Sequence, residues 1–270
     1  MKKIITNLLI FSLFLGVIFC LGSCGNKVNY DNYEKYAPGD WAQTVLITGI
    51  DIEWLSGKVE ILPHEYGYVA VTESSESEII GGVAMHSYYD GATLRIKPCA
   101  SGTGANAVPE KTLTVYVPFG YSFSDIDINT GSADVKIEDA GANFIEVNTG
   151  SGNVELNIEG KSQEIDVNTA SGEVKLNAEA SRSVEIETAS GNITVENRIM
   201  PAELEISSLS GNVICYLPED AGFTLECATA SGKINNSFTV TESGGNKVVG
   251  NGVADVEITT ASGDVTIDKK

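Results

Sequence analysis

A repeat of roughly 20 residues constrains this chain more than any other feature of its sequence. A threonine or serine anchors each copy. Aliphatic residues stand four and two positions before the anchor and five and seven positions after it, with few exceptions. The anchors are Thr130, Thr149, Thr169, Thr188, Ser208, Thr229 and Thr260, with spacings of 19, 20, 19, 20, 21 and 31 residues. This alternation on both sides of a turn predicts a strand, a turn and a second strand in every copy, with one buried face.

The turn between the two strands is equally regular. Serine lies two positions after every anchor, and glycine lies three positions after every anchor except one, where Ala133 stands instead. We expect this glycine to supply a positive φ and the serine to bond neighbouring backbone groups. An eighth copy lies upstream in the same register, at residues 50–61. Asn236 interrupts an aliphatic column where the spacing lengthens, which predicts that residues 235–253 leave the repeat as a hairpin.

The repeat length favours one architecture. A unit of about 20 residues cannot bury its own apolar face, so it must stack on its neighbours. The sequence therefore predicts an all-β fold, a right-handed β-solenoid (β-helix-like) in which equivalent residues form ladders, because parallel crossovers are almost always right-handed. A β-propeller is the alternative, since a blade of about 40–45 residues could hold two copies. Alternate copies show no systematic difference, which favours the solenoid.

The repeat resembles a known family. The segments Thr169–Val174, Thr188–Gly191 and Thr260–Val265, with the lead-in Gly250–Gly252, are similar to the tandem Thr-x-Ser-Gly-x-Val units of the bacterial putative-adhesin family of domains of unknown function. The likeness extends over residues 45–267. It implies a β-solenoid outside the cytoplasm, and it brings no catalytic residues to carry over. The tyrosine-rich segment before Trp41 resembles Firmicute members, which indicates a Gram-positive source.

The start of the chain indicates export. Two lysines precede an apolar run that ends in Leu21-Gly22-Ser23-Cys24, and this sequence resembles the lipobox of bacterial lipoproteins. We expect residues 1–23 to be a signal peptide, Cys24 to carry the lipid that binds the membrane, and residues 24–40 to be a polar tether. Residues 41–270 would then form the solenoid domain, with clear repeats over 126–267. Plain secretion with an incidental cysteine is the alternative.

Composition limits the partners. The chain has 17 basic and 37 acidic side chains, a net charge of −20. Nucleic acid and anionic lipid head groups need a cationic surface, so neither is an expected partner. Beyond the signal, the three cysteines Cys99, Cys215 and Cys227 are an odd set, too few for a disulfide scaffold.

One outward column, three positions before the anchor, is acidic in all eight copies. This acidic column consists of Asp51, Asp127, Glu146, Asp166, Glu185, Glu205, Glu226 and Glu257. A strip that binds cations or a cationic ligand is one interpretation, and the column residues from Asp127 to Glu257 are its candidate metal ligands. A solvated face is the interpretation we favour, because Ca²⁺ needs 6–8 oxygens around a defined loop. No cofactor is expected.

Catalysis finds no support in the sequence. His64 and His86 are the only histidines, and neither has the spacing of a metal ligand or of a base beside a nucleophile. Carbohydrate-active β-helix enzymes use a pair of acids, but a catalytic pair would interrupt the repeat at one place, whereas these acids recur in every copy. The tyrosines Tyr66, Tyr68, Tyr88 and Tyr89 could stack on sugars or on a protein. We expect them instead to cover the open first coil, because solenoid ends require caps.

These observations predict a lipid-anchored, cell-surface protein of the structural or adhesive type, without catalysis, that presents an acidic repetitive wall. An envelope protein or a glycan would be its ligand. An envelope-stress or sensory accessory protein that binds a membrane partner is the first alternative. A carbohydrate-active β-helix enzyme is the second.

Overall fold

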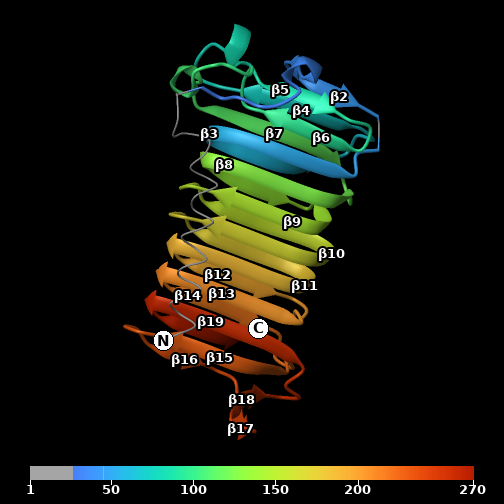
Figure 1. The fold of residues 1–270 in the computed structure, drawn as a ribbon. Helices are drawn as coiled ribbons and strands as arrows, with labels where there is room; N and C mark the ends of the chain where they lie inside the picture. The colour runs from blue at the N-terminus through green and yellow to red at the C-terminus, as the bar shows by residue number, and fades with distance from the viewer. Residues whose placement is uncertain (1–26, 45) are drawn as a thin grey trace.

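The computed structural model describes residues 27–44 and 46–270, which form an all-β solenoid (Figure 1). The predicted signal peptide, residues 1–23, and the predicted lipid acceptor Cys24 lie outside the described residues. The strands are β1 (Ala37–Pro38), β2 (Trp41–Gln43), β3 (Gly49–His64), β4 (Val69–Ser74), β5 (His86–Tyr89), β6 (Thr93–Lys97), β7 (Lys111–Pro118), β8 (Ser122–Glu138), β9 (Gly141–Thr149), β10 (Val154–Thr169), β11 (Val174–Ser190), β12 (Ile193–Asn197), β13 (Glu203–Ser210), β14 (Val213–Leu217), β15 (Phe223–Thr229), β16 (Ile234–Asn236), β17 (Val240–Ser243), β18 (Asn246–Val249), β19 (Ala254–Ser262) and β20 (Val265–Lys269). The 3-10 helices of the described part are η2 (Tyr33–Lys35), η3 (Gly81–Val83) and η4 (Ala105–Ala107). None of the helices in this part is long and apolar enough to cross a membrane.

Each coil contributes one strand to each of two walls. The first wall holds the strands that end in the anchor, and the second wall holds the strands that follow the turn. Successive coils pair in parallel and in register, as Ile145, Ile165 and Val184 show on neighbouring strands. Long strands such as β10 and β11 pass through a corner from one wall to the other.

The predicted apolar ladders are the core of the solenoid. The column four positions before the anchor is buried along its whole length, at Ile126, Ile145, Ile165, Val184, Leu204, Val256 and Leu225. Burying each such side chain contributes about 1.5–3 kcal/mol. The parallel pairing between copies confirms the solenoid, and it excludes the β-propeller, whose blades are antiparallel sheets.

The repeat glycine has a different role from the one we predicted. None of the glycines three positions after the anchors has a positive φ. A Cβ atom built on Gly152 would lie 1.8 Å from the carbonyl oxygen of Ala133 on the preceding coil, and one on Gly191 would lie 1.9 Å from that of Gly172. Glycine is therefore required at this position because the backbones of stacked coils approach closely. Among the repeat glycines, only Gly57 of the upstream copy has a positive φ, of 98°.

A second polar column supports the same turn. The residue four positions after the anchor accepts a hydrogen bond from the backbone N–H of the equivalent residue on the next coil. The N–H of Asn153 donates to Asp134 Oδ1 over 2.8 Å, and that of Glu173 donates to Asn153 Oδ1 over 2.9 Å. This polar column ties the coils together along the turn edge.

The order of the coils departs from the order of the chain at both ends. Strands β19 and β20 lie between β13 and β14 on one side and β15 and β16 on the other. At the opposite end, β3 lies between β8 and the pair formed by β6 and β7. The coil that is last in the chain is therefore not the last coil in space.

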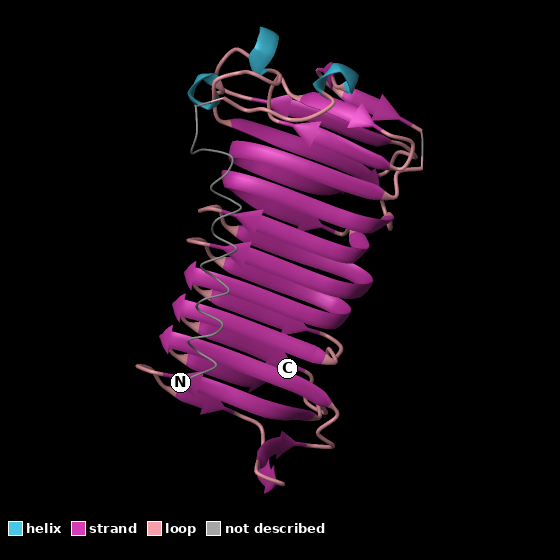
Figure 2. Ribbon diagram, viewed as in Figure 1, coloured by secondary structure: helices cyan, strands magenta, loops and turns pink. Residues whose placement is uncertain are grey.

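Antiparallel strands cap the N-terminal end (Figure 2). Strand β4 pairs with β7 and β5 pairs with β6, and β2 and β1 add a further strand to each wall. Residues 27–40, which we assigned to a tether, pack on this cap. Val28 is buried and accepts a hydrogen bond from Gly102, while the hydroxyl of Tyr30 donates to the Cys99 carbonyl over 2.9 Å.

A hairpin covers part of the C-terminal end. Strands β17 and β18 are antiparallel around the turn Gly244–Gly245, as the sequence predicted, and β18 pairs with β15. Phe238 packs edge-on against Phe223, with ring centroids 5.3 Å apart. The excursion begins later than residue 235, because Asn236, at the end of β16, still pairs with Ile267 of β20.

Candidate functional site

The acidic column forms one continuous row on the first wall. Its carboxylates stand in register in the spatial order Asp51, Asp127, Glu146, Asp166, Glu185, Glu205, Glu257 and Glu226. Parallel strands place consecutive members about 4.8 Å apart. At the N-terminal end Arg95 terminates the row, with its Nη1 2.5 Å from Asp51 Oδ2. The structure thus brings all eight predicted residues together.

An asparagine ladder runs beside the acidic column, one position before the anchor. Asn148 donates to Asn129 Oδ1 and Asn168 donates to Asn148 Oδ1, both over 3.1 Å. Each asparagine also donates to the acid two positions before it, as Asn168 does to Asp166 over 2.8 Å. The hydrogen bonds from the asparagine amides restrain the orientation of the neighbouring carboxylate groups. We did not predict it, although three asparagines at the repeat spacing were visible in the sequence.

The electrostatics of the row oppose full ionisation. Partial burial, and then repulsion by carboxylates on neighbouring coils, raise the pKa of Asp127 to about 6 and that of Asp166 to about 7. The same causes raise the pKa of Glu185, and that of Glu187 in the neighbouring column to about 7. The row therefore holds protons near neutral pH that isolated carboxylates would release.

The arrangement is a row and not a cage. Within residues 27–44 and 46–270, no three His, Cys, Asp or Glu side chains converge on a point where they could hold a metal ion. Each coil contributes one carboxylate to the column, on a sheet whose strands run side by side. Such a surface can attract positive charge along its length, but it lacks the surrounding oxygens of a specific Ca²⁺ site.

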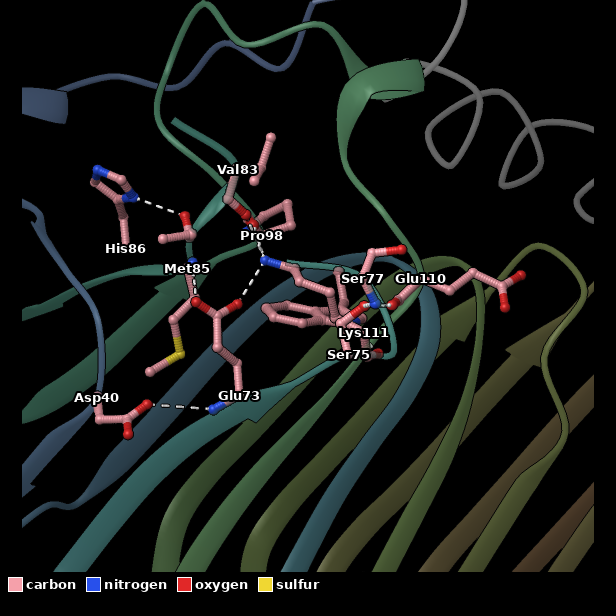
Figure 3. Close-up of polar contacts among 12 residues, drawn as sticks. Asp40, Glu73, Ser75, Ser77, Val83, Met85, His86, Pro98, Glu110 and Lys111 are labelled. Atoms are coloured by element: carbon pink, nitrogen blue, oxygen red, sulfur yellow. Dashed lines mark hydrogen bonds and ion pairs between the residues drawn. The ribbon is translucent and has the colours of Figure 1, made fainter. Parts of the chain in front are cut away.

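The N-terminal cap contains a buried ion pair that the sequence did not reveal (Figure 3). Lys111 Nζ lies 2.6 Å from Glu73 Oε2 and donates to the carbonyl oxygens of Val83 and Pro98. It also lies 4.8 Å from the ring centroid of Trp54. All three N–H groups of the ammonium have acceptors, and Glu73 accepts from the backbone of Met85 over 2.7 Å. The cluster joins β7 to β4 and to the loops of the cap, so its geometry is that of a structural contact.

The cysteines and histidines have structural surroundings. Cys99, Cys215 and Cys227 carry free thiols, and burial raises the pKa of each, that of Cys99 to about 11. His64 and His86 bond to backbone carbonyls, of Tyr68 and Ala84 respectively. Raised thiol pKa values oppose nucleophilic chemistry at these cysteines.

The tyrosines divide into two groups. Tyr88 and Tyr89 belong to the cap, where they pack against Tyr36 and Trp41, as we predicted. The prediction is wrong for Tyr66 and Tyr68, which are 55% and 38% exposed and stack on one another outside the core.

The chain is similar to one family of protein domains and to two solved structures. The family model of Toastrack domains (DUF4097) matches residues 50–198 and 119–268. A putative cell adhesion protein from Clostridium sporogenes is 13% identical, with 87% of this chain and 100% of that chain covered and a TM-score of 0.39. A putative adhesin from Bacteroides fragilis is 15% identical, with coverage of 85% and 96% and a TM-score of 0.39. The comparison with curated proteins found no match.

Proposed function

Because the chain belongs to the Toastrack family, and because its first residues resemble a lipobox, we propose a lipid-anchored cell-surface protein of the structural or adhesive type. It acts without catalysis and presents the acidic first wall to positively charged groups of envelope or host molecules. Lipid on Cys24 would bind the protein to the membrane, since stable anchoring takes more than one acyl chain and lipoprotein cysteines carry several.

The difference between the two walls supports this proposal. On the second wall the equivalent outward column alternates in charge, as Glu60, Lys136, Glu155 and Lys175 on successive coils. On the first wall every member is acidic, although neighbouring carboxylates repel by roughly 1 kcal/mol at this spacing in water. The same coils can therefore carry a neutral column, so uniform negative charge is not a requirement of stacking. A ligand-facing role explains why it is present on one wall only.

Cell adhesion tests the role of the acidic column. Cells that display the full chain would be compared with cells that lack it, on surfaces coated with polylysine, dextran or polyglutamate. One variant replaces four column acids by their amides, at Asp166, Glu185, Glu205 and Glu257. The matched control makes the same number of acid-to-amide replacements on the second wall and at the turn before it, at Glu60, Glu138, Glu155 and Glu173. We expect retention on polylysine to fall in the first variant, and to fall less in the control. Equal retention by both variants would contradict the role of the first wall.

Lipidation has a separate test. Cells fed an alkynyl fatty acid should label the native chain, and Cys24→Ala should abolish the label because the acceptor thiol is gone. Cys99→Ala is the matched control, since that buried thiol in the cap is not a lipobox residue. Label that persists on the Cys24→Ala chain would refute the anchor.

A further inference from the structure

We propose that an exposed aromatic platform, formed by His64, Tyr66, Tyr68 and Tyr116, is a binding site for a neutral glycan. The platform lies on the second wall beside the N-terminal cap, where β3 ends at His64 and β4 begins at Val69. It names a ligand class for the proposed adhesive function and is separate from the acidic column.

The rings form an ordered stack. The centroids of Tyr66 and Tyr68 are 5.6 Å apart, and their planes differ by 19°. Tyr66, at 55% exposed, is the outer ring, and Tyr68, at 38%, supports it. His64 meets both tyrosines edge-on, with centroid distances of 5.5 and 5.1 Å, and its ring lies 5.9 Å from that of Tyr116.

Backbone hydrogen bonds hold the platform in place. His64 Nε2 lies 2.7 Å from the carbonyl oxygen of Tyr68, which can only accept, so Nε2 carries the proton and donates. The N–H of Phe119 donates to the carbonyl of His64 over 3.2 Å, which places the turn after β7 next to the platform. Phe119 is itself 67% exposed. Rings that are already ordered lose little conformational entropy when a ligand binds.

Folding does not require these rings to face water. Three other aromatic groups near this end are covered: Trp54 and Phe123 are buried in the core, and Tyr121 packs against Phe123 with centroids 4.9 Å apart. Tyr66 leaves more than half of its surface in solvent, and an aromatic side chain that is buried contributes far more to stability than an exposed one. Grouped, exposed aromatic residues mark interaction sites more often than isolated ones do.

The chemistry of the platform fits a sugar ring. A pyranose has a flat face of C–H groups and a rim of hydroxyls, which match the face of a tyrosine ring and its phenolic hydroxyl. A stable protein partner would need about 800 Å² on each side, more than a few ring faces provide. The net charge of −20 opposes polyanionic glycans, so a neutral glycan is the class that the surface favours.

Direct binding tests the platform apart from cell adhesion. Cellohexaose, chitohexaose and mannohexaose would be titrated into the purified full-length chain by calorimetry, with tetramethylammonium chloride as the probe for a cation on the ring faces. We expect at least one hexaose to bind with a dissociation constant of about 10 µM to 1 mM, a range typical of small, open sites. A failure of the adhesion assay on polylysine leaves this result unaffected, so the two proposals fail separately.

The variants identify the site. The double variant Tyr66→Ala with Tyr68→Ala should weaken hexaose binding at least tenfold, whereas Tyr66→Phe with Tyr68→Phe, which keeps both rings, should stay within about threefold. Tyr33→Ala is the matched control, because Tyr33 is 62% exposed on η2 and outside the platform. Unchanged melting temperatures establish that the variants are folded. Absence of binding by the native chain, equal binding by the alanine variant, or binding of tetramethylammonium alone would each overturn the proposal.

Discussion

Substitution of one repeat glycine tests the close approach of the coils. In Gly191→Ala the new Cβ atom would lie 1.9 Å from the carbonyl oxygen of Gly172, whereas real contacts of this kind exceed 3.0 Å. The two coils must therefore separate by about 1 Å at this turn. Two backbone bonds cross the same gap: the N–H of Ser190 donates to Ala170 over 3.1 Å, and that of Val174 donates to Asn192 over 2.9 Å. Loss of two bonds at about 0.5–1.5 kcal/mol each, together with steric strain of about 1–3 kcal/mol, predicts a destabilisation of roughly 2–6 kcal/mol.

Urea and thermal unfolding, followed by circular dichroism, measure this loss. For a domain of this size the melting temperature should fall by roughly 5–25 °C. Gly67→Ala is the control, because its Cβ would have no atom within 4 Å and its φ is not positive, so its stability should change by less than about 0.5 kcal/mol. If Gly191→Ala were as stable as the native chain, the glycine column would not be explained by close approach.

Four further predictions concern buried and charged groups. Lys111→Met leaves Glu73 as a buried carboxylate without its cation and should lower the free energy of unfolding in urea by about 3–5 kcal/mol. Adding Glu73→Leu to this variant should restore most of the lost stability. A double variant that is no more stable than Lys111→Met would contradict this. The pKa values of Asp166 and Glu187 are about 7 in the folded protein, whereas the ordinary values of the two carboxyl groups are 3.8 and 4.5. The native state therefore binds these protons more tightly than the unfolded chain does, and the free energy of unfolding should fall as the pH rises from about 4 through 7. Melting temperatures across this range should show the fall, and Asp166→Asn with Glu187→Gln should flatten it; a melting temperature that rises over the same interval argues against raised pKa values. Millimolar Ca²⁺ should raise the melting temperature no more than NaCl of equal ionic strength, and a specific rise of several degrees that is lost in Asp166→Asn would show that the row binds the ion. Both amide atoms of the buried Asn197 lack hydrogen-bond partners in the structure, so Asn197→Leu should stabilise by about 1–2 kcal/mol in urea, and a clear loss would show that the amide is satisfied in solution.

The apolar columns and the acidic column could be predicted because each copy repeats the same pattern. A side chain that alternates in and out along a strand must stack on its equivalent in the next coil, so the alignment of Ile145 with Ile165 predicts their contact. The same alignment contained the asparagine ladder at Asn129, Asn148 and Asn168, which a search of the column before the anchor would have found. We misassigned the role of the repeat glycine because a glycine in a turn allows both a positive φ and a close approach of two backbones, and the sequence does not distinguish the two.

The contacts of the N-terminal cap could not be predicted in the same way. They depend on single contacts between distant residues, such as Lys111 with Glu73 at a separation of 38 residues, and no periodicity marks such pairs. The exposed stack of Tyr66 on Tyr68 depends likewise on a local loop between β3 and β4. Aromatic composition alone predicted a plug for both groups of tyrosines, but only the geometry separates Tyr88, in the cap, from Tyr66, in solvent.

The spatial order of the end coils could not be predicted, because the repeat pattern does not determine which copies are neighbours. Every copy has the same register, so the pattern at Thr229 and Thr260 allows either coil to pair with the coil of Ser208. The chain places the later copy inside, and β19 gains a parallel partner on both edges, β13 and β15. At the other end β3, the first long strand, is likewise covered on both edges. The terminal coils of a solenoid have a neighbour on one side only and are the first to open. Because an earlier or a later segment of the chain covers each of these strands, the coils nearest both chain ends are enclosed by coils formed from the chain interior.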